Sequence, residues 1–190
     1  MPWSAYGRVN TVTYNMLRRA KESGLWCVFY GYETGNEDLL KIINKGATLE
    51  QAIEATKWTH SLGIDTKGSF MLALPHETPE KGQKTIDFAK KLNVTFAQFL
   101  LTYPEWGTAL YDEALKSGKF VFHGYKGRTK ALYVPNGYKN AEEARKMQKR
   151  AYHSFYFRSR FIWKHFKRLK NPKLIRQYYE GLKYVFGVSF

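Results

Sequence analysis

The first 118 residues alternate between two hydrophobic patterns in a regular order. Short, nearly continuous apolar and aromatic runs occupy residues 25–32, 67–74 and 94–103, which is typical of strands covered on both faces. Between these runs, apolar residues recur at helical spacing. Strands that alternate with helices favour parallel strands joined by right-handed crossovers. With a short strand near residues 3–9, the pattern predicts an α/β fold of about four βα units.

Capping residues support the helices of this pattern. Thr48 begins a capping box, Thr78 precedes Pro79 at a helix start, and Asn36 is predicted to cap a further helix. An earlier helix is expected over residues 13–23. Since a closed eight-stranded barrel needs roughly 250 residues, four units predict part of a larger sheet, and a chain that begins almost directly on a strand suggests an internal start.

Polar sequences follow three of the predicted strands. They are Gly31-Tyr32-Glu33-Thr34-Gly35, Ala73-Leu74-Pro75-His76-Glu77-Thr78 and Tyr103-Pro104-Glu105-Trp106-Gly107-Thr108. Ligands of parallel α/β proteins bind at the carboxyl ends of strands, and carboxylates and hydroxyls suit a ligand with hydroxyls and an amine. The alternative is that these residues serve only as helix caps and turns. Both interpretations stay open at this point.

Several kinds of site are excluded. The single cysteine, Cys27, rules out an intramolecular disulfide or a multi-cysteine cluster built from this chain alone, and its apolar surroundings favour an inert buried thiol. His76 and Glu77 do not begin a zinc-protease motif, because position 80 is Glu80 rather than histidine. No apolar run reaches the roughly 20 residues of a spanning helix, and the first residues lack a signal peptide's apolar segment. We expect a cytoplasmic chain, at most peripheral to a membrane.

The last 50 residues carry most of the excess charge. Residues 141–190 hold thirteen Lys or Arg and three Glu, a net of +10 out of +15 for the chain, interleaved with many aromatic residues. Such a mixture can bind nucleic acid or an anionic membrane surface. Alternatively, amphipathic helices dock their aromatic side chains on the α/β layer and leave the charges in water, which is the interpretation we favour.

Taken in order, these segments resemble radical S-adenosylmethionine (SAM) enzymes. The segment RVNTVTYNMLRRAKESGLWCVFYGYETGNEDLLKIINKGATLEQA resembles the third strand to fourth helix of their barrel, GSFMLALPHETPE the fifth strand, and FAQFLLTYPEWGTALYDEALKSG the sixth. Residues 133–172 resemble the C-terminal helical extension of the subgroup that carries an N-terminal cobalamin-binding domain. The resemblance implies a partial (β/α) TIM-type barrel over residues 1–118, then a connecting segment and a basic, aromatic-rich helical extension over residues 119–190.

The resemblance also implies roles for particular residues. Glu33 stands where the family's fourth-strand glutamate contacts SAM, and Thr34 replaces the usual serine. Arg8 matches the third-strand arginine, for which a purely structural role is open. Glu77 keeps the carboxylate of the fifth-strand motif, in which Ala73 and His76 replace glycines. The implied cofactor-binding residues are Glu33, Thr34, Leu72, Ala73, Pro75, Glu77, Tyr103 and Pro104, with no metal ligand and no catalytic residue assigned.

The family's CxxxCxxC triad, which binds a four-iron four-sulfur cluster, is absent from these residues. The resemblance therefore implies the C-terminal part of an enzyme that cleaves SAM reductively at a 4Fe-4S cluster, often for cobalamin-dependent methyl transfer, and we expect this chain alone to be inactive. Its expected partners are a missing N-terminal half with the cobalamin domain and a small-molecule or lipid-like substrate. A peripheral membrane contact through the basic tail is open, and nucleic acid is not expected. The alternative function is a basic module that binds nucleic acid or anionic membrane without catalysis.

Overall fold

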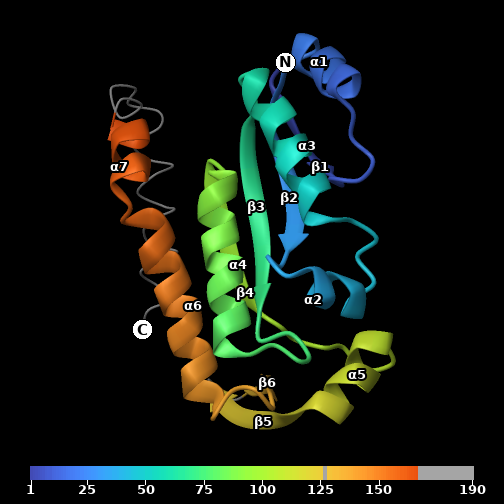
Figure 1. The fold of residues 1–190 in the computed structure, drawn as a ribbon, viewed down its shortest axis with the longest axis vertical. Coiled ribbons are helices and arrows are strands. Elements are labelled where there is room, and N and C mark those ends of the chain that lie inside the picture. Colours follow the sequence, from blue (N-terminus) through green and yellow to red (C-terminus); the bar gives the residue numbers. More distant parts are fainter. Residues whose placement is uncertain (126–127, 167–190) are drawn as a thin grey trace.

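A sheet of four parallel strands in sequence order forms the centre of the molecule (Figure 1). The computed structural model describes residues 1–125 and 128–166. The strands are β1 (Trp3–Gly7), β2 (Leu25–Glu33), β3 (Asp65–Leu72) and β4 (Phe96–Leu101). The first four helices are α1 (Tyr14–Glu22), α2 (Glu37–Ile42), α3 (Leu49–Ser61) and α4 (Pro79–Leu92), followed after β4 by α5 (Ala109–Ser117). This order confirms the predicted α/β fold with four strands joined by helical crossovers.

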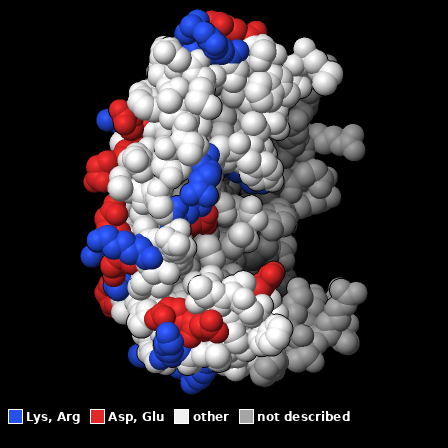
Figure 2. Space-filling model, turned by 90° about the vertical axis from the view of Figure 1, so that its right-hand side faces the viewer, with Lys and Arg blue, Asp and Glu red and all other residues white. Residues whose placement is uncertain are grey.

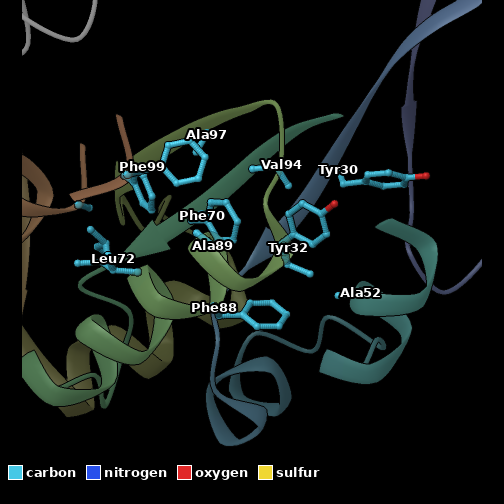
Figure 3. Close-up of a cluster of buried hydrophobic side chains, with 14 of the residues drawn as sticks. Tyr30, Tyr32, Ala52, Phe70, Leu72, Phe88, Ala89, Val94, Ala97 and Phe99 are labelled. Carbon is cyan, nitrogen blue, oxygen red and sulfur yellow. The ribbon is translucent and has the colours of Figure 1, made fainter. Parts of the chain in front are cut away.

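The core lies between one face of the sheet and the helices α3, α4 and α6 (Ala141–Tyr156). On this face the rings of Tyr32, Phe70 and Phe99 form a continuous row, with 5.4 Å between successive ring centroids (Figure 3). The Tyr32 hydroxyl is paired with Thr56 of α3 at 2.7 Å, so its polar end is satisfied inside the core. Burial of these side chains, each worth about 1.5–3 kcal/mol, fixes the sheet against its helices.

The opposite face of the sheet is only partly covered. The side chains of Phe29, Lys67 and Gln98 are half-buried, and Leu100 is exposed. On the sheet's edge strand, Tyr6 is 89% exposed. The described helices thus cover one face, and the prediction of strands covered on both faces is confirmed for that face alone.

Two of the three predicted helix caps are present. Thr48 forms the complete capping box of α3, and the Thr78 hydroxyl accepts a hydrogen bond from the Lys81 amide at the start of α4. Asn36 stands at the predicted N-cap position of α2, but its side chain makes no cap hydrogen bond and donates instead to the carbonyl of Lys81 and to the hydroxyl of Thr85. Asn36 therefore ties the start of α2 to α4.

A β-hairpin occupies most of the predicted connecting segment. Its strands, β5 (Gly118–Tyr125) and β6 (Arg128–Pro135), pair antiparallel and lead into α6 and α7 (Ser159–Phe166). The sequence analysis missed this hairpin because it expected only a linker there. The boundary predicted at residue 118 falls where α5 gives way to the hairpin, and the division into two domains stays a prediction.

The helix α6 packs on the sheet through its aromatic side chains. The hydroxyls of Tyr152 and Tyr156 accept hydrogen bonds from the Phe99 and Ala97 amides of β4, and Phe155 is fully buried. The favoured interpretation of the tail as a docked amphipathic helix is therefore confirmed over α6. Residues 167–190 lie outside the described part of the chain. Within the described part, no helix combines the length and apolarity that crossing a membrane requires.

Candidate functional site at the carboxyl edge of the sheet

The three polar sequences meet at one edge of the sheet because β2, β3 and β4 are parallel and paired in register. Glu33 pairs with Phe70 of β3, and Leu72 pairs with Leu101 of β4, so the strands end side by side. Three residues here have left-handed backbone: Glu33 (φ 63°), Ala73 (φ 59°) and His76 (φ 61°). This conformation is costly for residues with a Cβ atom and recurs at binding sites.

The carboxylate of Glu33 lies at this edge in an ion pair. Its Oε1 is 2.6 Å from Nζ of Lys45, and the two side chains keep 18% and 21% of their surface exposed. A Cβ atom at Gly31 would come within 2.3 Å of the same oxygen. Glycine at position 31 thus makes room for the carboxylate, which stays within reach of a ligand.

Residues outside the three loops place Lys45. The Arg8 guanidinium donates to the carbonyl of Lys45 at 2.9 Å, and the Asn10 amide donates to the carbonyl of Gly46 at 2.6 Å. The structural role left open for Arg8 is therefore supported by its hydrogen bond to the backbone of Lys45. Sequence reasoning did not single out Lys45 and missed its contact with Glu33. The sequence Asn44-Lys45-Gly46, with left-handed backbone at Asn44 and Gly46, is the signal that could have found it.

Thr34 is fully buried. Its hydroxyl is 3.0 Å from the hydroxyl of Thr85 on α4, which also accepts hydrogen bonds from the Gly35 amide and the Asn36 side chain. These contacts fasten the loop after β2 to α4. Thr34 thus positions the loop that carries Glu33. No signal in the sequence identified Thr85 as the centre of these contacts.

Glu77 is also fully buried. Its Oε1 accepts hydrogen bonds from the Ala73 amide at 2.6 Å and from the Tyr138 hydroxyl at 2.7 Å, and its Oε2 has no partner among the described residues. Burial raises the pKa of the Glu77 carboxyl to about 7, although the hydrogen bonds from Tyr138 and Ala73 oppose this change. The carboxylate therefore stabilises the turn after β3 from within.

The other predicted residues divide between the core and the surface. Leu72, Ala73 and Pro75 are buried beneath the edge, and Pro104 is buried after β4, whereas Tyr103 is 60% exposed. The structure brings all eight predicted residues to one edge. Of these, Glu33 and Tyr103 keep side-chain surface for a ligand. Contact of any of them with SAM stays a prediction.

The rim of the edge is held by further polar contacts between side chains. His76 Nε2 lies 2.7 Å from Glu113 of α5, and Lys81 pairs with Asp38 of α2. Figure 2 shows Lys and Arg side chains next to Asp and Glu side chains along one face, without a large patch of one sign. The alternative function rests on the basic tail, of which residues 167–190 lie outside the described part of the chain, so it stays a prediction.

The chain's own residues do not fit an iron–sulfur cluster. Cys27 is the single cysteine, it is 2% exposed, and burial together with the nearby Asp65 raises the pKa of its thiol to about 11. A cluster needs several thiolates, and the described residues contain no group of three or more His, Cys, Asp or Glu side chains that could hold a metal. The prediction that Cys27 is a buried thiol is confirmed.

Comparisons with known proteins agree with the predicted family. Residues 7–89 match the Radical SAM superfamily. An uncharacterized methyltransferase, PH0819, from Pyrococcus horikoshii is 34% identical over 85% of this chain and 36% of its own length. Bacteriochlorophyllide d C-12(1)-methyltransferase from Chlorobaculum tepidum is 32% identical over 50% of this chain and 21% of its own length. The chain thus spans about a third or less of these relatives.

The fold also resembles a solved structure of the radical SAM methyltransferase TsrM from Kitasatospora setae, with tryptophan substrate and a SAM analogue bound. The TM-score is 0.65 at 15% identity, over 78% of this chain and 35% of TsrM. At this identity the likeness concerns the fold, and it agrees with the four parallel βα units. Residues 7–89 thus carry the match to the radical SAM superfamily, and the likeness to TsrM agrees with that match in fold.

Proposed function

We propose that this chain forms the SAM-binding part of a radical SAM methyltransferase. The observation that carries the proposal is the Glu33 carboxylate, which lies within the matched residues 7–89 and is held by Lys45 at the edge where three strands end. Methyltransferases among the relatives support methyl transfer as the reaction class. When bound, SAM supplies the activated methyl group and the nucleoside on which the family's chemistry depends.

Each part of the edge has a proposed task. Glu33 is an acceptor and suits the hydroxyls and amine of SAM. Lys45 holds this carboxylate in position through their 2.6 Å contact. The turn containing Ala73 follows the neighbouring strand β3, and its backbone is proposed to contact the nucleoside of SAM. Tyr103, after β4, has an exposed ring that could contact the same ligand. Arg8 and Thr34 hold the loops in place through the contacts described above.

The cluster ligands would come from protein outside these 190 residues. Because a 4Fe-4S cluster needs several thiolates and Cys27 is buried, we propose that a segment carrying CxxxCxxC completes the enzyme. The relatives, of which this chain spans 36% or less, leave room for such a segment. Cobalamin belongs to the same proposal through an N-terminal domain, and the chain alone would be inactive.

The experiment measures SAM affinity in the full-length protein by equilibrium dialysis. A charge-assisted hydrogen bond is worth roughly 1.5–3 kcal/mol, so we expect Glu33→Gln to weaken SAM binding about tenfold or more. Gly31→Ala should also weaken binding, because its methyl group would displace the Glu33 carboxylate.

Glu22→Gln is the matched control for this experiment. Glu22 forms an ion pair of the same 2.6 Å length with Arg18, but on α1, at the amino-terminal end of the sheet (Figure 1). This variant should bind SAM with wild-type affinity. If Glu33→Gln also binds with wild-type affinity, Glu33 is not a SAM ligand. Absence of SAM binding by the wild-type protein would contradict the proposed function itself.

A further inference from the structure

One buried oxygen atom connects the ligand edge to the segment after the hairpin. Oε1 of Glu77 accepts both the Ala73 amide, in the turn after β3, and the hydroxyl of Tyr138, which follows β6. Tyr138 is 4% exposed and lies outside residues 7–89, the range that matches the superfamily. A residue beyond the matched domain is thus in contact with the carboxylate that supports the candidate SAM site.

The backbone around Tyr138 and Glu77 packs closely at two glycines. A Cβ atom at Gly82 would lie 2.7 Å from the Tyr138 hydroxyl, and one at Gly137 would lie 2.4 Å from the carbonyl oxygen of Glu77. The Tyr138 amide also donates to the carbonyl of Pro135, which closes a turn. Two glycines therefore allow the extension and α4 to approach closely enough for the hydroxyl to reach Glu77.

The turn after β3 needs this support. Ala73 has φ 59°, a conformation that a residue with a Cβ atom avoids unless its surroundings impose it. Ala73 is fully buried, so its amide requires an acceptor within the protein. Glu77 supplies that acceptor, and its own amide donates to the carbonyl of Leu74 at 2.9 Å. The carboxylate thus holds the turn in the shape that faces the edge.

We propose that Tyr138 is a positioning residue for the SAM site, which acts through Glu77 to hold the turn of residues 73–76, in which Ala73 and His76 have left-handed backbone. The inference rests on the proposed function for the identity of the ligand. The hydrogen bonds from Tyr138 to Glu77 and from Ala73 to Glu77 carry the positioning itself. In this role the segment after the hairpin is part of the binding site's support, rather than a separate module.

The protonation state of Glu77 gives the positioning role of Tyr138 a measurable pH dependence. Burial raises the pKa of this carboxyl to about 7, and the hydrogen bond from Tyr138 is the largest influence that lowers it. Lys81 of α4 also faces Glu77, while Glu80 and Glu143 lie near Tyr138. Because an ionised carboxylate accepts stronger hydrogen bonds than a protonated one, the turn should be held best above about pH 7.

The test compares Tyr138→Phe with the wild-type full-length protein in two measurements. Hydrogen exchange of the peptide that contains residues 73–77 reports the turn without any ligand, and we expect exchange in the variant to be about tenfold faster. Equilibrium dialysis with SAM between pH 6 and pH 9 should give about fivefold weaker binding at neutral pH. The loss of SAM affinity on acidification should also begin at a higher pH than in the wild-type protein, because the Glu77 pKa is no longer lowered by the hydroxyl.

Tyr30→Phe is the matched control. Tyr30 is equally buried, and its hydroxyl pairs with Thr59 of α3 at 2.9 Å, in the body of the fold. This variant loses the same chemical group, but exchange in residues 73–77 and the pH dependence of SAM binding should not change. An amino group titrates near pH 8 in free SAM and does so equally for every variant, so the comparison between variants isolates Glu77.

Glu77→Gln completes the series, because it keeps an acceptor for Ala73 but cannot titrate. Its SAM affinity should lack the acid-dependent step that Glu77 causes. Wild-type exchange of residues 73–77 in folded Tyr138→Phe would overturn the proposal. If Tyr138→Phe does not fold, an unchanged pH response in Glu77→Gln would overturn it. If the wild-type protein fails to bind SAM, the proposed function fails, and hydrogen exchange still decides whether Tyr138 holds the turn.

Discussion

Glu33 and Glu77 follow neighbouring strands at the same edge of the sheet, yet they lie in opposite environments. Glu33 is paired with the ammonium group of Lys45 at 2.6 Å and keeps 18% of its side chain exposed. Glu77 is fully buried, and its partners are an amide and a hydroxyl. A carboxylate at a strand end can therefore either face a ligand or stabilise the loop that does, and its position in the sequence does not distinguish the two.

The difference arises from what surrounds each carboxylate. Around Glu33, Gly31 leaves space and the turn at Lys45 supplies a charge from a flexible side chain. Around Glu77, Gly82 and Gly137 let backbone from two other segments approach until no solvent remains. Gly31 thus leaves the Glu33 carboxylate accessible, whereas Gly82 and Gly137 allow neighbouring segments to enclose the Glu77 carboxylate.

The largest expected effect is the difference between the stability lost when Glu77 is removed and the stability lost when Glu33 is removed. Glu77→Ala leaves the buried Ala73 amide and Tyr138 hydroxyl without an acceptor, so it should lower the free energy of unfolding by about 2–5 kcal/mol. Glu33→Ala should cost less than about 1 kcal/mol, because its ion pair is partly exposed. Urea denaturation of both variants measures the difference. Equal losses would show that the two carboxylates do not differ as described.

A second expectation concerns the pH dependence of the free energy of unfolding. Burial raises the pKa of Glu77 from 4.5 to about 7, so folding is favoured by the protonated form and this contribution is complete below pH 4.5. As the pH rises from 4.5 to 7, the wild-type protein should lose up to about 3 kcal/mol relative to Glu77→Gln, which does not titrate. Denaturation curves at several pH values test this. A constant difference between the two proteins would contradict it.

Much of this arrangement could be predicted from the sequence. Apolar runs, capping residues and their order indicated the four parallel strands, and parallel pairing then required the three polar sequences to meet at one edge. Thr48 and Thr78 cap their helices as expected. These features depend on neighbours in the chain, and local sequence patterns report such neighbours well.

The roles within the edge could not be predicted, because they depend on contacts between distant residues. Tyr138 is 61 residues from Glu77, and Thr85 is 51 residues from Thr34. Asn36 looks like an ordinary cap in the sequence, but Thr85 and Lys81 offer its side chain other partners. The hairpin β5–β6 was missed for a related reason, since its strands lack the continuous apolar runs of the central sheet.

The smallest expected effects are the coupling energies of the Glu33–Lys45 and Glu77–Tyr138 pairs, measured by double-mutant cycles in unfolding experiments. A cycle of Glu33→Gln and Lys45→Met should give a coupling of about 0.5–1 kcal/mol, because both side chains are partly exposed to solvent. A cycle of Glu77→Gln and Tyr138→Phe, carried out above pH 7, should give about 1.5–3 kcal/mol, because the hydrogen bond to an ionised carboxylate is buried. Raising the salt concentration to about 1 M shortens the Debye length to about 3 Å, and should reduce the first coupling while leaving the second nearly unchanged. If both couplings respond equally to salt, solvent reaches both carboxylates alike, and Glu77 could no longer be distinguished from Glu33 as a residue that acts from inside the fold.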